Sequence, residues 1–275
     1  MNFNFIKNLF GILFLLFSFS SFAQRTTVRS EIGVIGGGMY YIGDLNNQAY
    51  WNNPSIGAGI IYRYTISDRW VLKTNALYGE ISHLNDNNPA RNLGFKSSIF
   101  EASVHIEFNF LPFFTDRSVF NFTPYIFCGL GVFTFNPKGM LNGEWYNLRD
   151  FKTEGQESPE YPDRKTYSVI QPNFPFGIGF KWDATKSICL GVEWGLRKTW
   201  TDYIDDVSTT YIDENILLHE GGELAKQLAD RSSNNRYHST GSLRGDPAKD
   251  DWYGFLGASV TFKLRPFYSR KTCNN

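Results

Sequence analysis

The sequence predicts an all-β protein: an eight-stranded antiparallel up-and-down transmembrane β-barrel with short periplasmic turns and long extracellular loops. Three observations predict it. After an export signal, apolar and polar residues alternate with period two over eight segments of about ten residues or more. The connections between these segments include short turns and much longer loops, as in outer-membrane barrels. No later window offers the roughly 18 consecutive apolar residues of a membrane helix.

Composition excludes several other classes. The chain has 275 residues, 17% of them aromatic, with a mean hydropathy of −0.32 and a formal net charge of 0. Without a basic excess, we expect no nucleic-acid partner, and a chain this rich in aromatics is not disordered. Its three cysteines form neither a disulfide framework nor a zinc-site spacing, and we expect no metal or other cofactor.

The N-terminus resembles a secretory signal peptide. Lys7 precedes an apolar run at 9–19, and Ser21-Phe22-Ala23 is a small-x-small cleavage site. The alternative, an uncleaved membrane anchor, is disfavoured because the run is short for a span of about 20 residues. The expected organisation is a signal peptide at 1–23, a barrel at 24–265 and a periplasmic tail at 266–275.

The expected strands are justified by their alternating faces. The clearest lies at 97–110, where apolar residues from Phe100 to Phe110 alternate with polar residues from Glu101 to Asn109. The segment at 122–136 is apolar on both faces, so its register stays ambiguous. In chain order the eight segments are 31–43, 55–66, 70–82, 97–110, 122–136, 173–182, 187–201 and 252–264.

The connections set the topology. Segments two and three, and segments six and seven, are joined by about four residues, whereas 137–172 and 202–251 are long. An even strand count places both chain ends on the short-turn, periplasmic side. Only a closed barrel leaves no unpaired backbone in lipid.

Alternation alone does not say which face points outward, and a soluble barrel would bury its apolar face. The export signal, the aromatic residues near strand ends and the balanced signs of the charged face favour a membrane barrel. An eight-stranded interior has room for side chains only, so we expect a plugged, polar-packed lumen. The expected lumen charge network consists of Arg63, Lys73, Glu101, His105, Glu107, Lys181, Glu193 and Arg197.

Two groups of residues could carry chemistry instead. Glu101, Ser103, His105 and Glu107 share one strand face, which would suit an outer-membrane hydrolase or acyltransferase; a structural network is the favoured interpretation, since a row on a strand is not a triad. Asp202, Asp205 and Asp206 form an acidic cluster at a loop base. It lacks the spacing of a calcium loop, so a solvated or hydrogen-bonded loop base is favoured over a cation site.

Three further features lie in the loops and the tail. Residues 214–231 are expected to form a helix or a broken pair interrupted at Gly221-Gly222. The tripeptide 244–246 (Arg-Gly-Asp) is assigned no role. Cys273, in the expected periplasmic tail, is a candidate for an intermolecular disulfide.

Several stretches resemble the PorG-like outer-membrane proteins of the type IX secretion system of Bacteroidetes. The resemblance extends from about residue 31 to 264, and RKTWTDYIDDVSTTY at 197–211 is its most specific motif. The stretches are EIGVIGGGMYYIGDLN (31–46), NPSIGAGIIYRYTISDRW (53–70), FTPYIFCGLGVFTFNP (122–137), PFGIGFKW (175–182), GVEWGLRKTWTDYIDDVSTTYID (191–213) and DWYGFLGASVTFKL (251–264).

The resemblance implies an eight-stranded barrel without catalytic residues, located in the bacterial outer membrane. It also implies association with periplasmic secretion-ring proteins like PorK and PorN, and a role in anchoring or assembling the secretion machinery. The expected partners are therefore outer-membrane lipid and such ring proteins. Two alternatives remain open: a structural or porin-like barrel without a secretion role, and an outer-membrane lipid-modifying enzyme.

Overall fold

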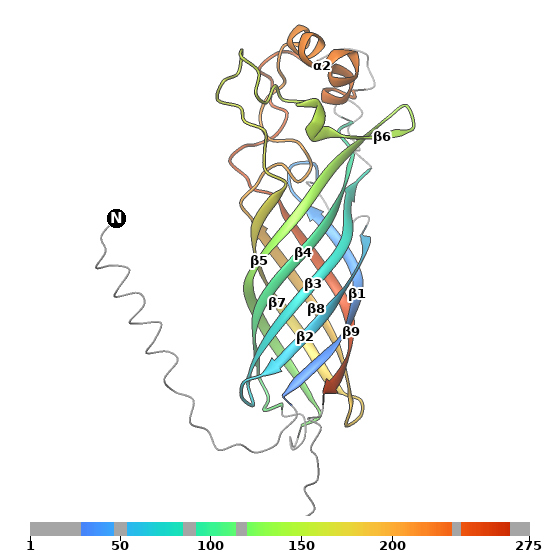
Figure 1. The fold of residues 1–275 in the computed structure, drawn as a ribbon, viewed down its shortest axis with the longest axis vertical. Coiled ribbons are helices and arrows are strands. Elements are labelled where there is room, and N and C mark those ends of the chain that lie inside the picture. The colour runs from blue at the N-terminus through green and yellow to red at the C-terminus, as the bar shows by residue number, and fades with distance from the viewer. Residues whose placement is uncertain (1–28, 47–53, 85–91, 114–119, 233–237, 265–275) are drawn as a thin grey trace, which may run out of the picture. The chain divides into compact units, whose positions relative to one another are not determined.

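A closed barrel dominates the computed structural model, which describes residues 29–46, 54–84, 92–113, 120–232 and 238–264. Within these residues, eight antiparallel strands pair in the order β1, β2, β3, β4, β5, β7, β8, β9, and β9 pairs back to β1. This confirms the predicted closed, eight-stranded antiparallel barrel. The long connections and helix α2 lie beyond one end of the barrel, here called the long-loop end (Figure 1). The opposite end is called the short-turn end.

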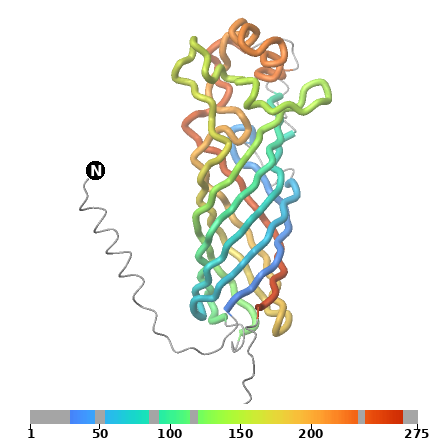
Figure 2. The backbone as a smooth tube through the Cα atoms, in the orientation of Figure 1, coloured from blue at the N-terminus to red at the C-terminus, as the bar shows by residue number. Residues whose placement is uncertain are grey.

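The strands agree with the expected segments to within three residues at most of their ends. Their bounds are β1 Ser30–Ile42, β2 Ser55–Thr65, β3 Trp70–His83, β4 Phe95–Asn109, β5 Phe122–Leu141, β7 Ile170–Asp183, β8 Ile188–Thr199 and β9 Trp252–Leu264. The strands run steeply inclined around the barrel, as the backbone tube shows (Figure 2).

The largest departure from the expected elements is at β5, which continues five residues beyond 136. It turns back into β6 (Glu144–Asn147), and Leu141 pairs with Glu144. The turn residues Asn142 and Gly143 both have positive φ, 51° and 87°, as the Asn-Gly pair of a tight hairpin requires. The predicted loop at 137–172 is therefore wrong at its start, because Asn142-Gly143 forms a tight turn that lets β5 continue and pair with β6.

The remaining loop elements are short. The 3-10 helix η1 (Leu148–Phe151) follows β6, and α2 (Glu214–Ala229) lies in the connection between β8 and β9. Asp213 caps α2 by accepting a hydrogen bond from the Asn215 backbone N–H. Gly222, with φ of 74°, breaks the helix, which confirms the predicted interruption. No helix in the described part of the chain is both long and apolar enough to cross a bilayer.

The apolar side chains of the barrel wall point outward, and the charged side chains point into the lumen. On β4, Phe100, Val104 and Ile106 are exposed, whereas Glu101, His105 and Glu107 are fully buried. The ambiguous β5 follows the same rule, with Leu130 69% exposed and Phe133 buried. An apolar outer wall around a charged interior is stable in lipid. In water the reverse arrangement, with the apolar side chains inside, would be favoured. The chain is therefore an outer-membrane type of β-barrel.

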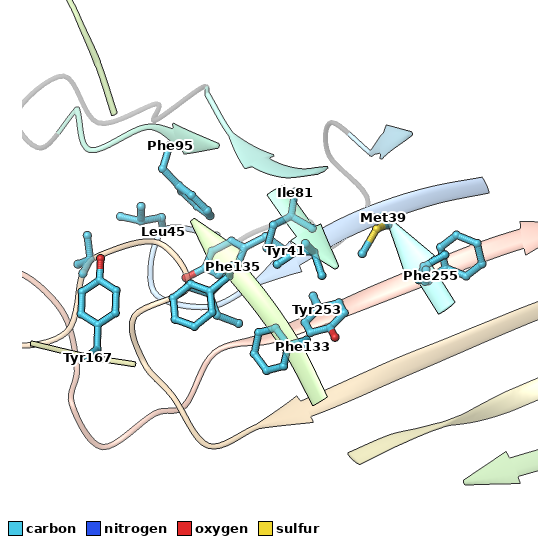
Figure 3. Packing of buried hydrophobic residues seen from close by; sticks show 14 of the residues in the cluster. Met39, Tyr41, Leu45, Ile81, Phe95, Phe133, Phe135, Tyr167, Tyr253 and Phe255 are labelled. Carbon is cyan, nitrogen blue, oxygen red and sulfur yellow. The ribbon is translucent and has the colours of Figure 1, made fainter. Parts of the chain in front are cut away.

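The lumen near the long-loop end contains an apolar core. It joins inward residues of the barrel, among them Met39, Phe133 and Phe255, to loop residues such as Leu45 and Tyr167. Figure 3 shows these side chains packed between the strand ends and the loops. The expectation of a polar-packed lumen is wrong for this part, because the connecting loops fold onto the barrel mouth and exclude water there.

Candidate functional site

The middle of the lumen is filled by ion pairs that cross it. Lys73 of β3 reaches Glu193 of β8, with 2.8 Å between Nζ and Oε2, and lies 3.5 Å from Glu107 of β4. Glu107 also pairs with Arg63 at 3.1 Å and with Lys181 at 2.7 Å. All five side chains are at most 2% exposed. Three cations thus share two carboxylates, leaving no open channel between the walls at this level.

A second group lies closer to the long-loop end. Arg197 Nε donates to Glu101 Oε2 at 3.1 Å, and the Tyr253 hydroxyl donates to the same oxygen at 2.8 Å. Asn173 Nδ2 donates to the Tyr253 hydroxyl oxygen at 2.6 Å. Seven of the eight residues expected in the lumen network therefore take part in ion pairs inside the barrel.

His105 is the exception, and its place in the charge network is corrected. It is fully buried in the lumen, but neither ring nitrogen has a hydrogen-bond partner among the residues that the structure describes. Its ring stacks on Phe127 with the centroids 5.2 Å apart. The neighbouring Ser103 hydroxyl donates to Glu101 at 2.8 Å. The hydroxyl, imidazole and carboxylate on this strand face thus do not form the relay that nucleophilic catalysis requires.

Glycines in the lumen wall leave space for aromatic rings that fill the lumen. A Cβ on Gly177 or Gly195 would lie 2.8 or 2.7 Å from Cζ of Phe127. Gly179 in the same way leaves room for Tyr125. At the short-turn end, Phe113 is buried, and the ammonium groups of Lys181 and Lys263 lie 5.7 and 5.9 Å from its ring centroid. The lumen is therefore filled from its short-turn end to the loops.

The loops at the other end form a folded cap, defined here as residues 43–46, 148–169, 200–213 and 238–251. Its centre is Arg244, fully buried, whose Nη1 donates to Glu154 Oε1 at 2.9 Å and whose Nη2 lies 3.5 Å from Asp206 Oδ2. Glu154 accepts in turn from the backbone N–H groups of Ser208 and Thr209. The two carboxylates raise the pKa of the Arg244 guanidinium against the opposing effect of burial.

The expected acidic cluster becomes part of this cap. Asp205 and Asp206 are fully buried and Asp202 is 7% exposed, so the cluster is buried and not solvated. Asp205 accepts hydrogen bonds from the Tyr41 hydroxyl and the Val207 backbone N–H. Asp206 accepts from the hydroxyls of Thr153 and Tyr167, and burial raises its pKa. Residues that lie next to the cluster, Tyr41, Glu154, Arg244 and Asp251, were not singled out from the sequence, because they are far apart in the chain. The 244–246 tripeptide had been assigned no role, which is wrong for Arg244.

The potential metal ligands and the cysteines form no metal or thiol site among the described residues. No group of three or more His, Cys, Asp or Glu side chains there is arranged to hold a metal ion. Cys128 is exposed on the outer wall, and Cys189 is buried; both thiols are free. Cys273, the signal peptide and the tail at 266–275 lie outside the described residues.

The outer wall carries aromatic residues where the apolar band ends. At the short-turn end, Trp70 of β3 is 45% exposed, and its ring centroid lies 4.9 Å from that of Phe108. Nearby, Phe122 and Phe180 stack at 5.7 Å. At the long-loop end Trp200 is exposed. Aromatic side chains at these depths are typical of membrane interfaces.

Comparison with known proteins identifies the family of this chain. The family described as "Domain of unknown function (DUF6089)" matches residues 7–226. The chain belongs to the DUF6089 family. No curated protein matches it.

Solved structures similar to this DUF6089 chain include three bacterial surface barrels. Neisserial surface protein A (NspA) is 10% identical with a TM-score of 0.43, covering 86% of this chain and 97% of its own. Ail of Yersinia pestis is 8% identical with a TM-score of 0.38, covering 86% and 97%. OprG of Pseudomonas aeruginosa is 11% identical with a TM-score of 0.38, covering 86% and 98%. Resemblance at this level carries no functional information.

Proposed function

We propose that this DUF6089 protein is a non-enzymatic, architectural barrel of the bacterial outer membrane that serves as an accessory or anchoring component of type IX secretion. The observation that supports an architectural role is the ion pair between Lys73 and Glu193 in a fully packed lumen. A barrel filled from end to end offers a rigid anchor in lipid and no path for a solute. The secretion role rests on the PorG-like motifs between residues 31 and 264.

The anchoring mechanism would use the two ends of the barrel differently. The apolar wall fixes the barrel in lipid, and the short-turn end faces the periplasm with both chain termini. Secretion-ring proteins of the PorK and PorN kind would dock there. Phe110 and Phe120 are partly exposed at this end, whereas Phe113 is buried in the lumen and is not available to a partner.

The absence of enzymatic activity is part of the proposal. It is supported by His105, whose ring nitrogens engage neither Ser103 nor a carboxylate. A lipid-modifying enzyme would instead change the lipid A or phospholipid profile of the host cell, and His105→Ala would abolish that change.

The test is deletion of the gene in its host. The proposal predicts that proteins carrying type IX signals accumulate in the periplasm, and that affinity purification of the tagged barrel recovers periplasmic ring proteins. Complementation by the wild-type chain should restore secretion. Normal secretion after deletion would eliminate the secretion role and leave the alternative, a structural outer-membrane barrel.

A further inference from the structure

The Tyr41 hydroxyl lies between two buried carboxyl groups from distant parts of the cap. Its oxygen is 2.6 Å from Oδ2 of Asp205 and 2.7 Å from Oδ1 of Asp251. All three side chains are at most 1% exposed. Because a phenol carries a single proton, it cannot donate fully to two ionised carboxylates at such distances. One of the two contacts therefore requires an additional proton on a carboxyl group.

Among the described residues, the remaining hydrogen bonds to the side chains of these two carboxyl groups come from backbone N–H groups. The second oxygen of Asp205 accepts from the Val207 backbone N–H, and that of Asp251 accepts from the Ile204 N–H, both at 2.9 Å. The Gly43 backbone closes the remaining side, since a Cβ there would collide with the Tyr41 hydroxyl and with Asp251. Each carboxyl is thus held in place with one oxygen turned to Tyr41.

The surrounding charges favour retention of this proton. Four further acidic side chains belong to the surroundings of Asp205 and Asp251. They are Asp44, which follows β1, and Asp202, Asp206 and Glu154. The cation acting on Asp205 is Arg244, which is bound to Glu154 and Asp206. On the solvent side, Lys249 pairs with Asp246. Tyr167 and Tyr203 face the cluster as neutral phenols. Carboxylates therefore outnumber cations around the pair.

We propose that Asp205, Tyr41 and Asp251 form a proton-dependent latch that fastens the cap to the barrel rim. With one proton retained, the three side chains tie residues 204–207 and residue 251 to the end of β1. Without it, two buried anions face one phenol, and the segments on either side separate.

The direction of the pH dependence follows from burial. Burial raises the pKa of Asp205 to about 7 and the pKa of Asp251 well above its usual value. A carboxyl that binds its proton more tightly in the closed cap favours the closed form most at low pH. That advantage is lost as the pH rises from the ordinary aspartate pKa of about 4 through the raised value. The latch is closed in acid and loosens toward and above neutral pH.

The test is hydrogen exchange on the full-length protein in detergent micelles, followed by mass spectrometry of peptides covering 200–213 and 244–251. After correction for intrinsic exchange, the opening constant of these segments should rise by about tenfold per pH unit for each proton released between about pH 5 and pH 7. Asp205→Asn should flatten this slope, because an amide can donate to Tyr41 in place of the retained proton. Asp250→Asn is the matched control and should keep the wild-type slope, since Asp250 pairs with Lys198 at the surface.

An infrared measurement keeps the latch testable if a variant loses its cap. Wild-type protein at about pH 6 should show the carbonyl stretch of a protonated carboxyl group, at a pH where an ordinary aspartate is ionised. The band should lose intensity in the double variant Asp205→Asn/Asp251→Asn and keep it in Asp250→Asn. Part of the band remains in both variants, because burial raises the pKa of Asp202 to about 9. A wild-type opening constant independent of pH, an unchanged slope in Asp205→Asn, or a band of unchanged intensity in the double variant would overturn the latch.

Discussion

Lys73 and Glu193 face each other across the full width of the barrel. Their strands, β3 and β8, are four steps apart by either route around the eight-stranded sheet, and Nζ lies 2.8 Å from Oε2. An ion pair between opposite walls occupies the centre of the lumen. This ion pair blocks the centre of the lumen and links its two opposite walls.

The energetic role of this pair can be measured with a double-mutant cycle. Lys73→Met and Glu193→Gln should each lower the free energy of unfolding by about 3 kcal/mol, because each leaves a buried charge without its nearest partner. The double variant should lose less than the sum of the two. Urea unfolding in lipid vesicles, followed by tryptophan fluorescence, gives these values. Lys198→Met, which breaks a partly exposed pair with Asp250, should change stability by less than about 1 kcal/mol. Additive losses would mean that Lys73 and Glu193 do not interact.

The packing of Phe127 against the wall predicts an effect of adding one methyl group. Gly195→Ala would place its Cβ 2.7 Å from Cζ of Phe127 and should destabilise the barrel by about 1–3 kcal/mol through overpacking. Gly36→Ala is the matched control, since its Cβ would meet nothing nearer than 4.0 Å. Equal unfolding free energies for the two variants would show that Phe127 does not fill the lumen at this level.

An arginine placed on the lipid-facing wall should lower the free energy of unfolding by an amount that depends on its depth in the bilayer. Val104, near the middle of β4, and Ile56, at the loop end of β2, are both exposed on the outer face. In a bilayer, Val104→Arg should lower the free energy of unfolding by about 2–4 kcal/mol, and Ile56→Arg should lower it by about 0–1 kcal/mol. Unfolding in vesicles compares the two. A similar cost at both positions would contradict the placement of the bilayer around the middle of the strands.

The cap predicts a local effect of removing its central cation. Arg244→Met leaves Glu154 and Asp206 buried without their ion-pair partner, so the cap should open more often while the barrel stays folded. Limited proteolysis should cut within 200–251 sooner, with unchanged heat-modifiable migration in gels. Lys249→Met, which alters an exposed pair with Asp246, should leave the cleavage rate unchanged. Simultaneous loss of cap and barrel would show that the two are one cooperative unit.

The barrel could be predicted from the sequence because each strand carries its own signal. Alternation on β4 is local, so the inward face from Glu101 to Asn109 follows from a dozen residues. The membership of Arg63, Lys73 and Glu193 in the lumen follows from the same rule. Their pairing does not, since strand spacing says which face a side chain takes and not which side chain it meets across the lumen.

The cap could not be predicted because its contacts join distant segments. Tyr41 lies within a predicted strand, but its contacts do not follow from that, because its partners Asp205 and Asp251 lie 164 and 210 residues further along. Arg244 stands in a polar stretch without periodicity, and only the folded loops show that it is buried. The β5–β6 hairpin is different, since its Asn142-Gly143 turn is a local signal in the sequence.

The buried side chains that cross the lumen predict a sealed barrel. Conductance of the purified full-length protein in planar lipid bilayers tests it most directly. The packed lumen from Phe113 through Lys73 and Glu193 to the cap predicts no channel steps at neutral pH, in bilayers where a known porin gives them. Reproducible single-channel conductance from the wild-type protein would contradict the claim and support the porin-like alternative.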